Sequence, residues 1–564
     1  MSSTLTDWSP ALVYVPIGVG VVFVAAHLVP YLLDAHNYRR PAIKGPWLNS
    51  LSDAWLAYAA AQGDRSERVH ELHKKYGKFV RVAPNHISIA DPEALQIVYA
   101  HGNGTLKTEF YDAFVSIRRG LFNTRDRAEH TRKRKLVSHV FSQQNVLAFE
   151  PHIRRHVRKF CAQWDERSTL AAKGENGADW EARDGKAWFD CLPHYNYLAF
   201  DIIGDLAFGS PFGMIPAQRD SAPMLEHVEG DDAKSAKRIV KHVPAIKILN
   251  DRGDYAASLG VMPPWWRPWA KRVPWYARGN AAVQCLAGLA VAAVAKRLEE
   301  GLPDEEDEEE EIDGEGTNGK KKRTDLLEKL LQGKDENGAP MGREELTAEA
   351  LTQLIAGSDT TSNSSCAITY YLATNPEKQR KLQAELDEHL SPTAMPTPAT
   401  SFEKVKSLPY LNACINEGLR LHATSSMGLP RVIPPGTTVE VCGEKFGPGS
   451  VLSVPSFTIH RDQSVWGEDV EAFRPERWFE AGTDVQAGTG TGPMAKAFNP
   501  FSYGPRACVG RNLASMELQI IISSVFARYE FELLKPGESL KTREGFLRKP
   551  LDCYVGMKRR TPKN

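Results

Sequence analysis

The residues most able to do chemistry stand together near the C-terminus, in the segment Phe501-Ser-Tyr-Gly-Pro-Arg-Ala-Cys-Val-Gly510. An apolar helical pattern follows from residue 511 to 526, so Cys508 stands where a helix begins. Unpaired backbone N–H groups and the positive end of the helix dipole favour a thiolate there. Arg506 adds a cation suited to a ligand carboxylate, while Gly504 and Gly510 remove side chains where a flat ligand could approach the backbone. The pattern indicates an anionic sulfur presented to a metal in a planar macrocycle.

This segment resembles the haem-binding loop of the cytochrome P450 superfamily, whose pattern is Phe-x-x-Gly-x-Arg-x-Cys-x-Gly. The five fixed positions match as Phe501, Gly504, Arg506, Cys508 and Gly510. The resemblance implies that haem b is the cofactor and that Cys508 is the axial ligand of its iron. A thiolate ligand pushes electron density onto iron and favours O–O cleavage. It also implies the P450 fold, which is mainly α-helical with small β-sheets (α+β).

Two further motifs follow the family's order. Glu417 and Arg420 stand three residues apart on one helical face, and with Arg477 they resemble the family's Glu-Arg-Arg lock, which supports the cysteine loop. An exposed helical ion pair is the alternative for Glu417 and Arg420 taken alone.

The segment His130-Thr-Arg-Lys-Arg134 resembles the helix that lies along the haem edge. His130 and Arg134, one turn apart, would face the haem propionates. The family more often has Trp in the place of His130, but His also donates a hydrogen bond. Arg431 is expected as a third propionate partner beside Arg506.

The segment Ala356-Gly-Ser-Asp-Thr-Thr361 lies in the middle of a long helical pattern. Gly and Thr are unfavourable at a helix centre, and such a cost often marks a bend at a functional site. By resemblance this is the oxygen-binding groove, in which Ala356 and Gly357 leave room for O2. Thr360 would hold a water chain and Asp359 would relay protons. Without the cysteine loop, the segment would indicate only a helix kink.

Four longer segments are similar to those of fungal benzoate 4-monooxygenases: Gly120–Lys135, Tyr197–Gly213, Glu345–Ser362 and Thr542–Pro550. This resemblance implies para-hydroxylation of benzoate to 4-hydroxybenzoate with O2 and NADPH. The electrons must come through a flavoprotein reductase, because the chain has no GxGxxG nucleotide fold and no Cys-rich iron–sulfur spacing. The alternatives are a same-fold monooxygenase of another aromatic or lipophilic compound, and a non-catalytic, membrane-tethered haem sensor.

A pocket for a small aromatic acid needs an apolar slot and a partner for the carboxylate, since a buried unpaired charge is costly. The expected walls are Phe110–Leu121, Gln353–Gly357 and Ser425–Leu429. The candidate carboxylate partners, among which the sequence does not choose, are Arg118, Arg119, Arg125, Ser116, Ser425 and Ser426.

A basic surface is expected on the opposite side of the helix that carries His130. Arg132, Lys133 and Lys135 would point away from the propionates, and with Arg511 they would form a docking face for an acidic reductase. An ordinary solvated helix face is the alternative.

Composition sets the class of protein. Hydrophobic residues make up 42% and charged residues 25%, which allows a globular core. Lys+Arg and Asp+Glu both number 70, so net charge gives no reason to expect a nucleic-acid partner. Eight cysteines without a CxxC pair argue against a disulfide scaffold or a zinc module. Apolar spacing predicts helices over 128–141, 190–208, 281–299, 346–374 and 377–390.

One segment departs from this average. Residues 11–33 carry no charge and would span roughly 34 Å as a helix, enough to cross a bilayer core. Arg39, Arg40 and Lys44 follow it, which favours a cytosolic C-terminal part. A cleaved signal peptide and a buried core helix are the alternatives.

The predicted organisation is therefore a lumenal N-terminus over 1–10, a transmembrane anchor over 11–33 and a hinge over 34–50. A haem-thiolate domain over 51–564 follows, with a disordered acidic and basic insertion at 300–323. We expect a single-pass protein of the endoplasmic reticulum membrane, in contact with membrane lipid, whose catalytic domain lies in the cytosol.

Overall fold

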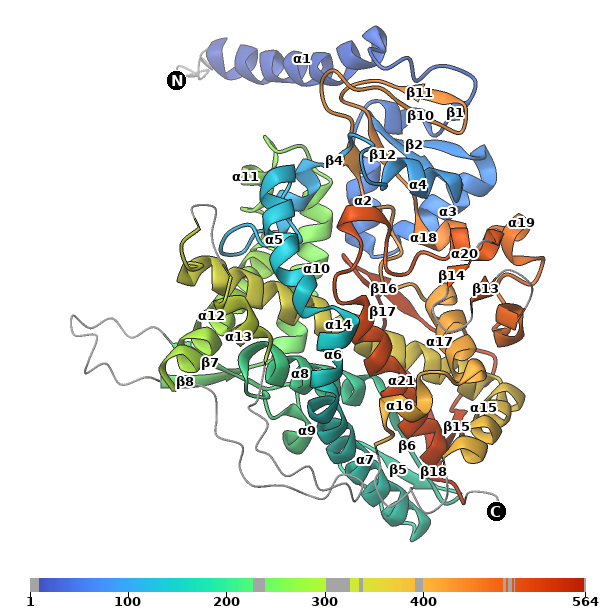
Figure 1. The fold of residues 1–564 in the computed structure, drawn as a ribbon. Coiled ribbons are helices and arrows are strands. Elements are labelled where there is room, and N and C mark those ends of the chain that lie inside the picture. Colours follow the sequence, from blue (N-terminus) through green and yellow to red (C-terminus); the bar gives the residue numbers. More distant parts are fainter. Residues whose placement is uncertain are drawn as a thin grey trace, which may run out of the picture.

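The structure, a computed structural model, describes residues 10–226, 239–300, 325–333, 338–390, 399–479, 483–484, 489–490 and 492–561. Residues 1–9 of the predicted lumenal segment and residues 301–323 of the predicted insertion lie outside this part. The described chain is mostly helical, with several small sheets at its periphery (Figure 1). The predicted mainly α class with small β-sheets is confirmed.

The long helices carry most of the domain. They are α3 (Arg65–Tyr76), α5 (Arg127–Val140), α7 (Glu150–Ala172), α8 (Leu192–Phe208), α10 (Ala245–Gly260), α12 (Pro274–Glu300), α14 (Arg343–Thr374), α15 (Pro376–His389), α17 (Pro409–Leu421) and α21 (Arg511–Arg528). Each helix predicted from apolar spacing is confirmed, with boundaries that differ by a few residues. Proline stands in the first turn of α7, α8, α15 and α17, where its missing N–H and fixed φ suit a helix start.

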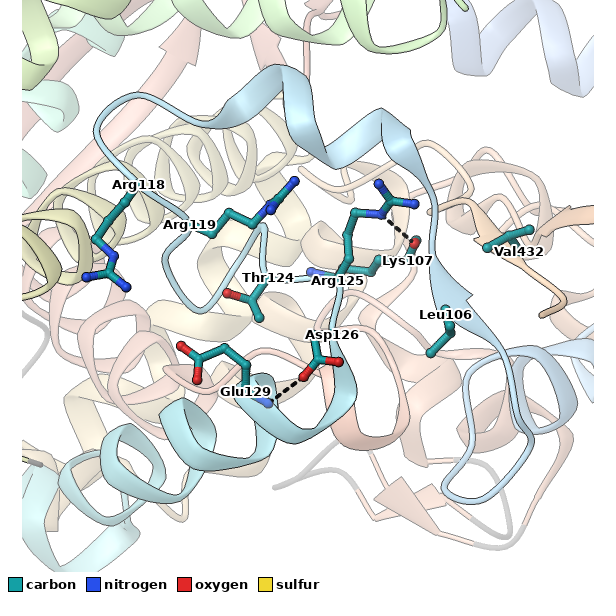
Figure 2. Close-up of a pocket in the computed structure, with 9 residues that line it drawn as sticks. All are labelled: Leu106, Lys107, Arg118, Arg119, Thr124, Arg125, Asp126, Glu129 and Val432. Atoms are coloured by element: carbon teal, nitrogen blue, oxygen red, sulfur yellow. Dashed lines mark hydrogen bonds between the residues drawn. The ribbon is translucent and has the colours of Figure 1, made fainter. Parts of the chain in front are cut away.

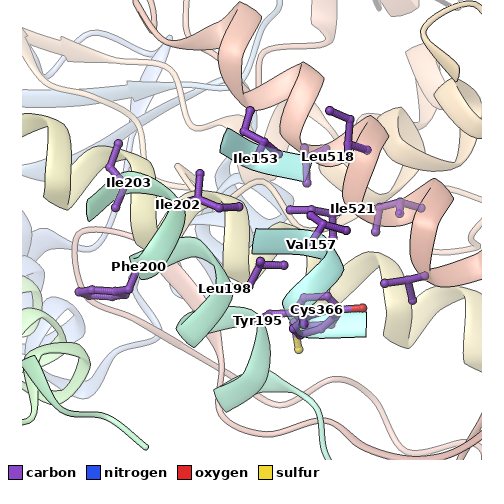
Figure 3. Close-up of a cluster of buried hydrophobic side chains, with 14 of the residues drawn as sticks. Ile153, Val157, Tyr195, Leu198, Phe200, Ile202, Ile203, Cys366, Leu518 and Ile521 are labelled. Atoms are coloured by element: carbon purple, nitrogen blue, oxygen red, sulfur yellow. The ribbon is translucent and has the colours of Figure 1, made fainter. Parts of the chain in front are cut away.

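The largest hydrophobic core lies where α7, α8, α14 and α21 pack against one another. Figure 3 shows Ile153 and Val157 of α7 and Leu198 of α8 facing Leu518 and Ile521 of α21. Helix α14 runs through this core and is buried on several faces along its length, as expected of a helix without a polar side. It therefore forms the central support of the domain.

The six-stranded sheet joins distant parts of the chain in the order β1-β2-β3-β12-β9-β4. Its strands are β1 (Ile43–Lys44), β2 (Phe79–Ala83), β3 (His86–Ile89), β4 (Leu106–Lys107), β9 (Arg431–Val432) and β12 (Val451–Ser453). Strands β4 and β9 are antiparallel, and their register places Lys107 directly opposite Arg431. This pairing brings two basic residues together at the edge of the sheet.

The other strands form a second sheet and short hairpins. The order of the second sheet is β15-β18-β6-β5, formed by β5 (Glu181–Arg183), β6 (Lys186–Asp190), β15 (Tyr529–Leu533) and β18 (Tyr554–Arg559). The hairpins are β7–β8 (Ala222–Glu226, Ile239–Val243), β10–β11 (Val439–Val441, Glu444–Phe446), β13–β14 (Thr483–Asp484, Thr489–Gly490) and β16–β17 (Thr542–Glu544, Arg548–Pro550).

The N-terminal helix α1 (Pro10–Leu33) lies at one end of the molecule, apart from the core (Figure 1). Its stretch from Tyr14 to Leu33 is long and apolar enough to cross a membrane, and none of it is buried. Helix α12 also passes this test, but half of its stretch is buried and it packs against α10 and α14. Helix α12 is therefore a core helix, and α1 is the candidate membrane anchor.

The segment predicted as a hinge, residues 34–50, packs onto the domain. Ile43 and Lys44 form β1, which pairs in parallel with β2, and Tyr38 is buried. The carboxylate of Asp34 accepts hydrogen bonds from the backbone N–H groups of Tyr38 and Arg39. The connection between α1 and the domain is therefore a folded segment rather than a free linker.

Candidate functional site

The cysteine loop is held by its own backbone. The N–H of Cys508 donates to the carbonyl of Phe501 at 2.8 Å, which closes the loop, and α21 begins at Arg511. Cys508 is exposed, whereas most other cysteines of the described chain are buried. Burial nevertheless raises the pKa of its thiol, while the N–H of Gly510 and the cations Arg134 and Arg511 oppose that rise. The residue is therefore accessible, although the surrounding protein raises the pKa of its thiol.

The two loop glycines have different reasons to be glycine. Gly504 has φ +73°, and a Cβ built there would lie 1.9 Å from the carbonyl oxygen of Tyr99. This glycine is required by the packing of the loop against the chain at Tyr99, not by the approach of a ligand. At Gly510 the nearest atom to a built Cβ is a ring carbon of Phe141 at 3.8 Å, so open space remains beside the sulfur.

Basic side chains gather beside the loop. Arg134 Nη1 donates to the carbonyl of Ala507 at 2.5 Å, and Arg506 Nη1 donates to the carbonyl of Thr124 at 2.6 Å. Burial together with the charges of Arg506, Lys107, Arg134 and Arg431 lowers the pKa of His130 to about 3. The structure thus brings together all four side chains predicted to face the propionates.

Lys107 is a fifth member of this cluster, and the sequence analysis missed it. Its side chain is 6% exposed and its ammonium donates to the carbonyl of Phe122. Burial lowers its pKa well below the usual range, and Arg431, Arg506 and Arg134 lower it further. A lysine in a two-residue edge strand has no local pattern that marks it. Only the pairing of β4 with β9 reveals its place.

The cluster fits a group that carries two carboxylates. Arg431 is buried and donates from Nη1 to the hydroxyl of Tyr111 at 2.7 Å, but its Nη2 is buried without a hydrogen-bond partner. Like charges placed directly opposite on antiparallel strands are destabilising, as Lys107 and Arg431 are. Buried donors and unbalanced positive charge beside an accessible cysteine are what the propionates and iron of a haem would satisfy.

The middle of α14 carries the predicted groove. Ala356 is exposed although Leu354 and Ser358 beside it are buried, so its side chain faces an open space. The hydroxyl of Thr360 donates to the carbonyl of Ala356 at 2.8 Å, a bond that locally competes with the helix. Gly357 is explained differently, because a Cβ there would lie 2.8 Å from Ile203 of α8. That glycine allows close packing of α14 on α8.

Two buried carboxyl groups lie close to this groove. Burial raises the pKa of Asp359 to about 6, an effect that Lys549 opposes and Asp220 adds to. On α21, Glu517 accepts a hydrogen bond from the Thr361 hydroxyl at 2.8 Å, and burial raises its pKa to about 7. Glu517 was not predicted, because its partner lies 156 positions away in the sequence.

The three lock residues form one buried network. Arg420 donates from Nε and Nη2 to the Glu417 carboxylate at 2.9 and 2.8 Å, and Arg477 Nε donates to it at 2.9 Å. The side chains of all three are 0% exposed. The exposed-pair alternative for Glu417 and Arg420 is therefore wrong. The indole of Trp478 and the N–H of Arg474 also donate to this carboxylate.

His460 links the network to the cysteine loop. Its Nδ1 lies 3.1 Å from the carbonyl of Arg420, and its Nε2 lies 2.9 Å from the backbone N–H of Asn499. A carbonyl can only accept and an N–H can only donate, so His460 is the neutral Nδ1–H tautomer. Burial and the nearby Arg420 and Arg461 lower its pKa to about 3, which agrees with this form.

The arginines proposed for a substrate carboxylate surround an open cavity of about 530 Å³ (Figure 2). Arg119 and Arg125 both donate to Asp112, at 2.9 and 2.8 Å, and Arg118 lies 3.9 Å from Glu345. Each therefore already has an acidic neighbour. Of the candidate serines, Ser426 donates to the carbonyl of Ala423, whereas Ser116 has a buried hydroxyl without a partner. Ser425 is half-buried.

The predicted basic docking face is smaller than expected, and its inclusion of Lys133 was wrong. Lys133 is 1% exposed and donates to Glu345 at 2.6 Å and to Glu349 at 2.9 Å, both on α14. Arg132 also pairs with Glu345 and is half-buried. Lys135 and Arg511 remain exposed. Glu345 and Glu349 of α14 pair with Arg132 and Lys133, so this side of α5 packs against α14 instead of facing solvent.

Comparison with known proteins adds one family match and three relatives. The family model for cytochrome P450 matches residues 49–557. The chain is 48% identical over 544 residues to benzoate 4-monooxygenase bphA of Aspergillus niger, covering 96% of each chain. It is 27% identical to cytochrome P450 monooxygenase cicH of Emericella nidulans, covering 96% and 98%, and 26% identical to pisatin demethylase of Fusarium vanettenii, covering 93% and 91%.

Proposed function

This chain belongs to the cytochrome P450 family and is a P450 monooxygenase, and we propose that it hydroxylates benzoate at the para position to give 4-hydroxybenzoate. O2 is the second substrate, and the electrons come from NADPH through a flavoprotein reductase. The observation that carries the proposal is the 48% identity, over 96% of both chains, to a protein named benzoate 4-monooxygenase. The other relatives reported above, with different names, are below 30% identity.

Haem b supplies the oxidising chemistry of this family when it is bound. In the proposal, the Cys508 thiolate would hold the iron, and the loop closed by the bond from the Cys508 N–H to the Phe501 carbonyl sets the position of the sulfur. Arg431 and Arg506 would hold the propionates together with His130, Arg134 and Lys107, because these basic side chains lie close together and the Nη2 of Arg431 is buried without a partner. Glu417, Arg420 and Arg477 fix the loop through His460.

Asp359 and Thr360 serve proton delivery. A carboxyl group whose pKa is about 6 can both hold and release a proton near neutral pH, which is the requirement for a relay. The Thr360 hydroxyl, held by the carbonyl of Ala356, offers a fixed oxygen to a water chain. The exposed methyl group of Ala356 leaves the space for O2. Lys135 and Arg511 are the exposed cations available to an acidic reductase.

The proposed location is the endoplasmic reticulum membrane, with the domain in the cytosol. The apolar helix α1 supports an anchor, and Arg39, Arg40 and Lys44 follow it on the side of the domain. A cytosolic domain is accessible to an NADPH-dependent reductase.

The test is a titration of the ferric, haem-loaded protein with benzoate, followed by turnover with a reductase and NADPH. We expect a shift of the haem towards high spin at millimolar benzoate, and 4-hydroxybenzoate as the product. Cys508→Ser should lose the reduced, CO-bound signature of thiolate ligation and the turnover. A response to phenylacetate or a fatty acid, but not to benzoate, would assign another substrate. NADPH consumption without any substrate dependence would point to the sensor alternative.

A further inference from the structure

Helix α10 carries at its centre a buried cation, Arg252, that forms no ion pair with an acid of the described chain. Arg252 is 6% exposed, and its Nη2 donates a hydrogen bond to the carbonyl of Phe114 at 2.8 Å. Its Nε is buried without any partner. Within the described part of the chain, no carboxylate forms an ion pair with it, and burial alone lowers its pKa to about 10. A buried guanidinium without an anion is a costly arrangement.

Helix α10, which carries Arg252, has neighbours that interact with both parts of the proposed site, the groove of α14 and the basic cluster. At the start of α10, the Asp220 carboxylate accepts the N–H groups of Ile246 and Lys247, and the same Asp220 lies close enough to raise the pKa of Asp359. At the other side, Arg252 contacts Phe114, the last residue of the short 3-10 helix η2 (Glu109–Phe114). Tyr111 of η2 accepts a hydrogen bond from Arg431 of the cation cluster. Helix α10 thus has one neighbour, Asp220, that acts on Asp359 of α14, and Arg252 itself contacts η2, the element whose Tyr111 binds Arg431.

An aromatic wall adjoins the guanidinium. The ring centroids of Phe114 and Phe122 lie 4.9 and 5.0 Å from that of Phe546, which stands at the tip of the β16–β17 hairpin. The Arg252 guanidinium carbon lies 5.8 Å from the centre of the Phe114 ring. Phe114 and Phe546 belong to different loops, which approach each other only in the folded chain. The wall and the cation together present an apolar surface beside a single positive charge.

Other buried polar atoms of the same loop lack partners. The Asn123 amide donates to the carbonyl of Phe114, the acceptor that Arg252 also uses, but its Oδ1 is buried and unpaired. The hydroxyl of Ser116, two residues beyond Phe114, is likewise buried and unpaired. Buried polar groups usually have hydrogen-bond partners in folded proteins, so the three unpaired atoms around this loop are free to bind a polar ligand.

We propose that Arg252 binds the carboxylate of the substrate, with the phenylalanine wall against the aromatic ring. The proposal rests on the proposed function, since it names the residue that recognises an aromatic acid. A planar guanidinium matches a carboxylate better than any other side chain does. Lys549, a second mostly buried cation, is less suited because Asp254 and Asp359 already lie close to it. Arg118, Arg119 and Arg125 have acidic neighbours as well.

The experiment compares an anionic ligand with a neutral one of the same shape. Benzoate and benzamide are titrated against the ferric, haem-loaded wild type and the variants Arg252→Gln and Arg252→Lys, with the dissociation constants read from the spin-state shift. Arg252→Gln should weaken benzoate about 10- to 100-fold and change benzamide less than threefold. Arg252→Lys keeps the charge but loses the planar fork, so it should weaken benzoate binding less than Arg252→Gln does. Arg278→Gln is the matched control, an exposed arginine of α12 paired with Asp251.

The outcomes separate the two proposals. Equal weakening of benzoate and benzamide by Arg252→Gln, or loss of the CO-bound thiolate signature, would make Arg252 a structural support for the Phe114 loop and overturn its assignment. The wild type could instead prefer another organic acid, and Arg252→Gln could weaken the binding of that acid selectively. In that case the proposed benzoate function is wrong, but the assignment of Arg252 as the carboxylate site is supported. If the wild type binds neutral aromatic compounds in preference to acids, both the proposed function and the proposed role of Arg252 are wrong.

Discussion

Replacement of Glu417 by glutamine tests whether a buried charge network holds the cysteine loop. The carboxylate accepts three guanidinium hydrogen bonds from Arg420 and Arg477, and two further bonds from Trp478 and the N–H of Arg474. In Glu417→Gln the side chain keeps its size but loses the charge. One of its two oxygens becomes an NH2 group that faces donors. The Arg420 guanidinium then loses the acid it pairs with, and Arg477 keeps only Asp469, whose Oδ1 lies 3.3 Å from its Nη1.

The expected cost is large relative to the stability of the protein. Removing one partner of a buried ion pair typically costs about 3–5 kcal/mol, and Glu417 is the buried acid that Arg420 and Arg477 share. Total unfolding free energies are about 5–15 kcal/mol, so the variant should lose at least about a third of a mid-range value. Because His460 connects Arg420 to Asn499 of the cysteine loop, the loss should also reach the haem site.

The assay follows urea unfolding by two signals, the far-UV circular dichroism and the absorbance of the reduced, CO-bound protein. We expect Glu417→Gln to unfold at a clearly lower urea concentration, and to lose the thiolate signature before its helices. Glu71→Gln is the control, because the Glu71–Lys74 pair at 2.8 Å is exposed on both sides and should contribute under about 0.5 kcal/mol. A Glu417→Gln variant that matches this control in both signals would refute the argument.

Two other predictions concern single buried charges. Asp359→Asn should slow substrate turnover, and its stability relative to wild type should increase from about pH 4 to about pH 6 and stay level above that range. Since burial raises the pKa of Asp359 to about 6, the folded wild type binds more protons than the unfolded chain between about pH 4 and 6. Its stability therefore falls with pH over this range, by up to about 3 kcal/mol, and thermal unfolding of both proteins at each pH checks the sign. Lys107→Met should stabilise the haem-free protein, because it removes a buried cation opposite Arg431, yet should release haem several-fold faster to apomyoglobin. Slower haem release would contradict a propionate role for Lys107.

Local patterns in the sequence were enough to predict the helices and the cysteine loop. The spacing that predicted a helix over 128–141 corresponds to α5 at Arg127–Val140, since its apolar face is set by neighbouring residues. The bond from the Cys508 N–H to the carbonyl of Phe501 closes within eight residues, so a ten-residue motif contains it. Features that depend on residues close together in the sequence can therefore be predicted from the sequence.

Features that depend on distant parts of the chain were missed or misread. Lys133 has the same local surroundings as Lys135, but Glu345 and Glu349, more than 200 positions away, bury it. Gly357 was interpreted as room for O2, and the sequence did not reveal a second constraint there, the close packing of Ile203 from another helix. The role of each of these residues depends on a neighbour that is distant in the sequence and comes close only in the folded chain.

The buried cations of this protein differ in one respect that bears on ligand binding. Lys133 faces two glutamates, and Arg420 and Arg477 share Glu417, so the chain itself neutralises these charges. Lys107 and Arg252 are equally buried, but neither forms an ion pair with an acid of the described chain. Since a buried charge is costly unless something compensates it, the ligands proposed above would supply the compensation for these two. A haem carries two carboxylates and benzoate carries one, and both groups of unmatched cations lie where such ligands are expected.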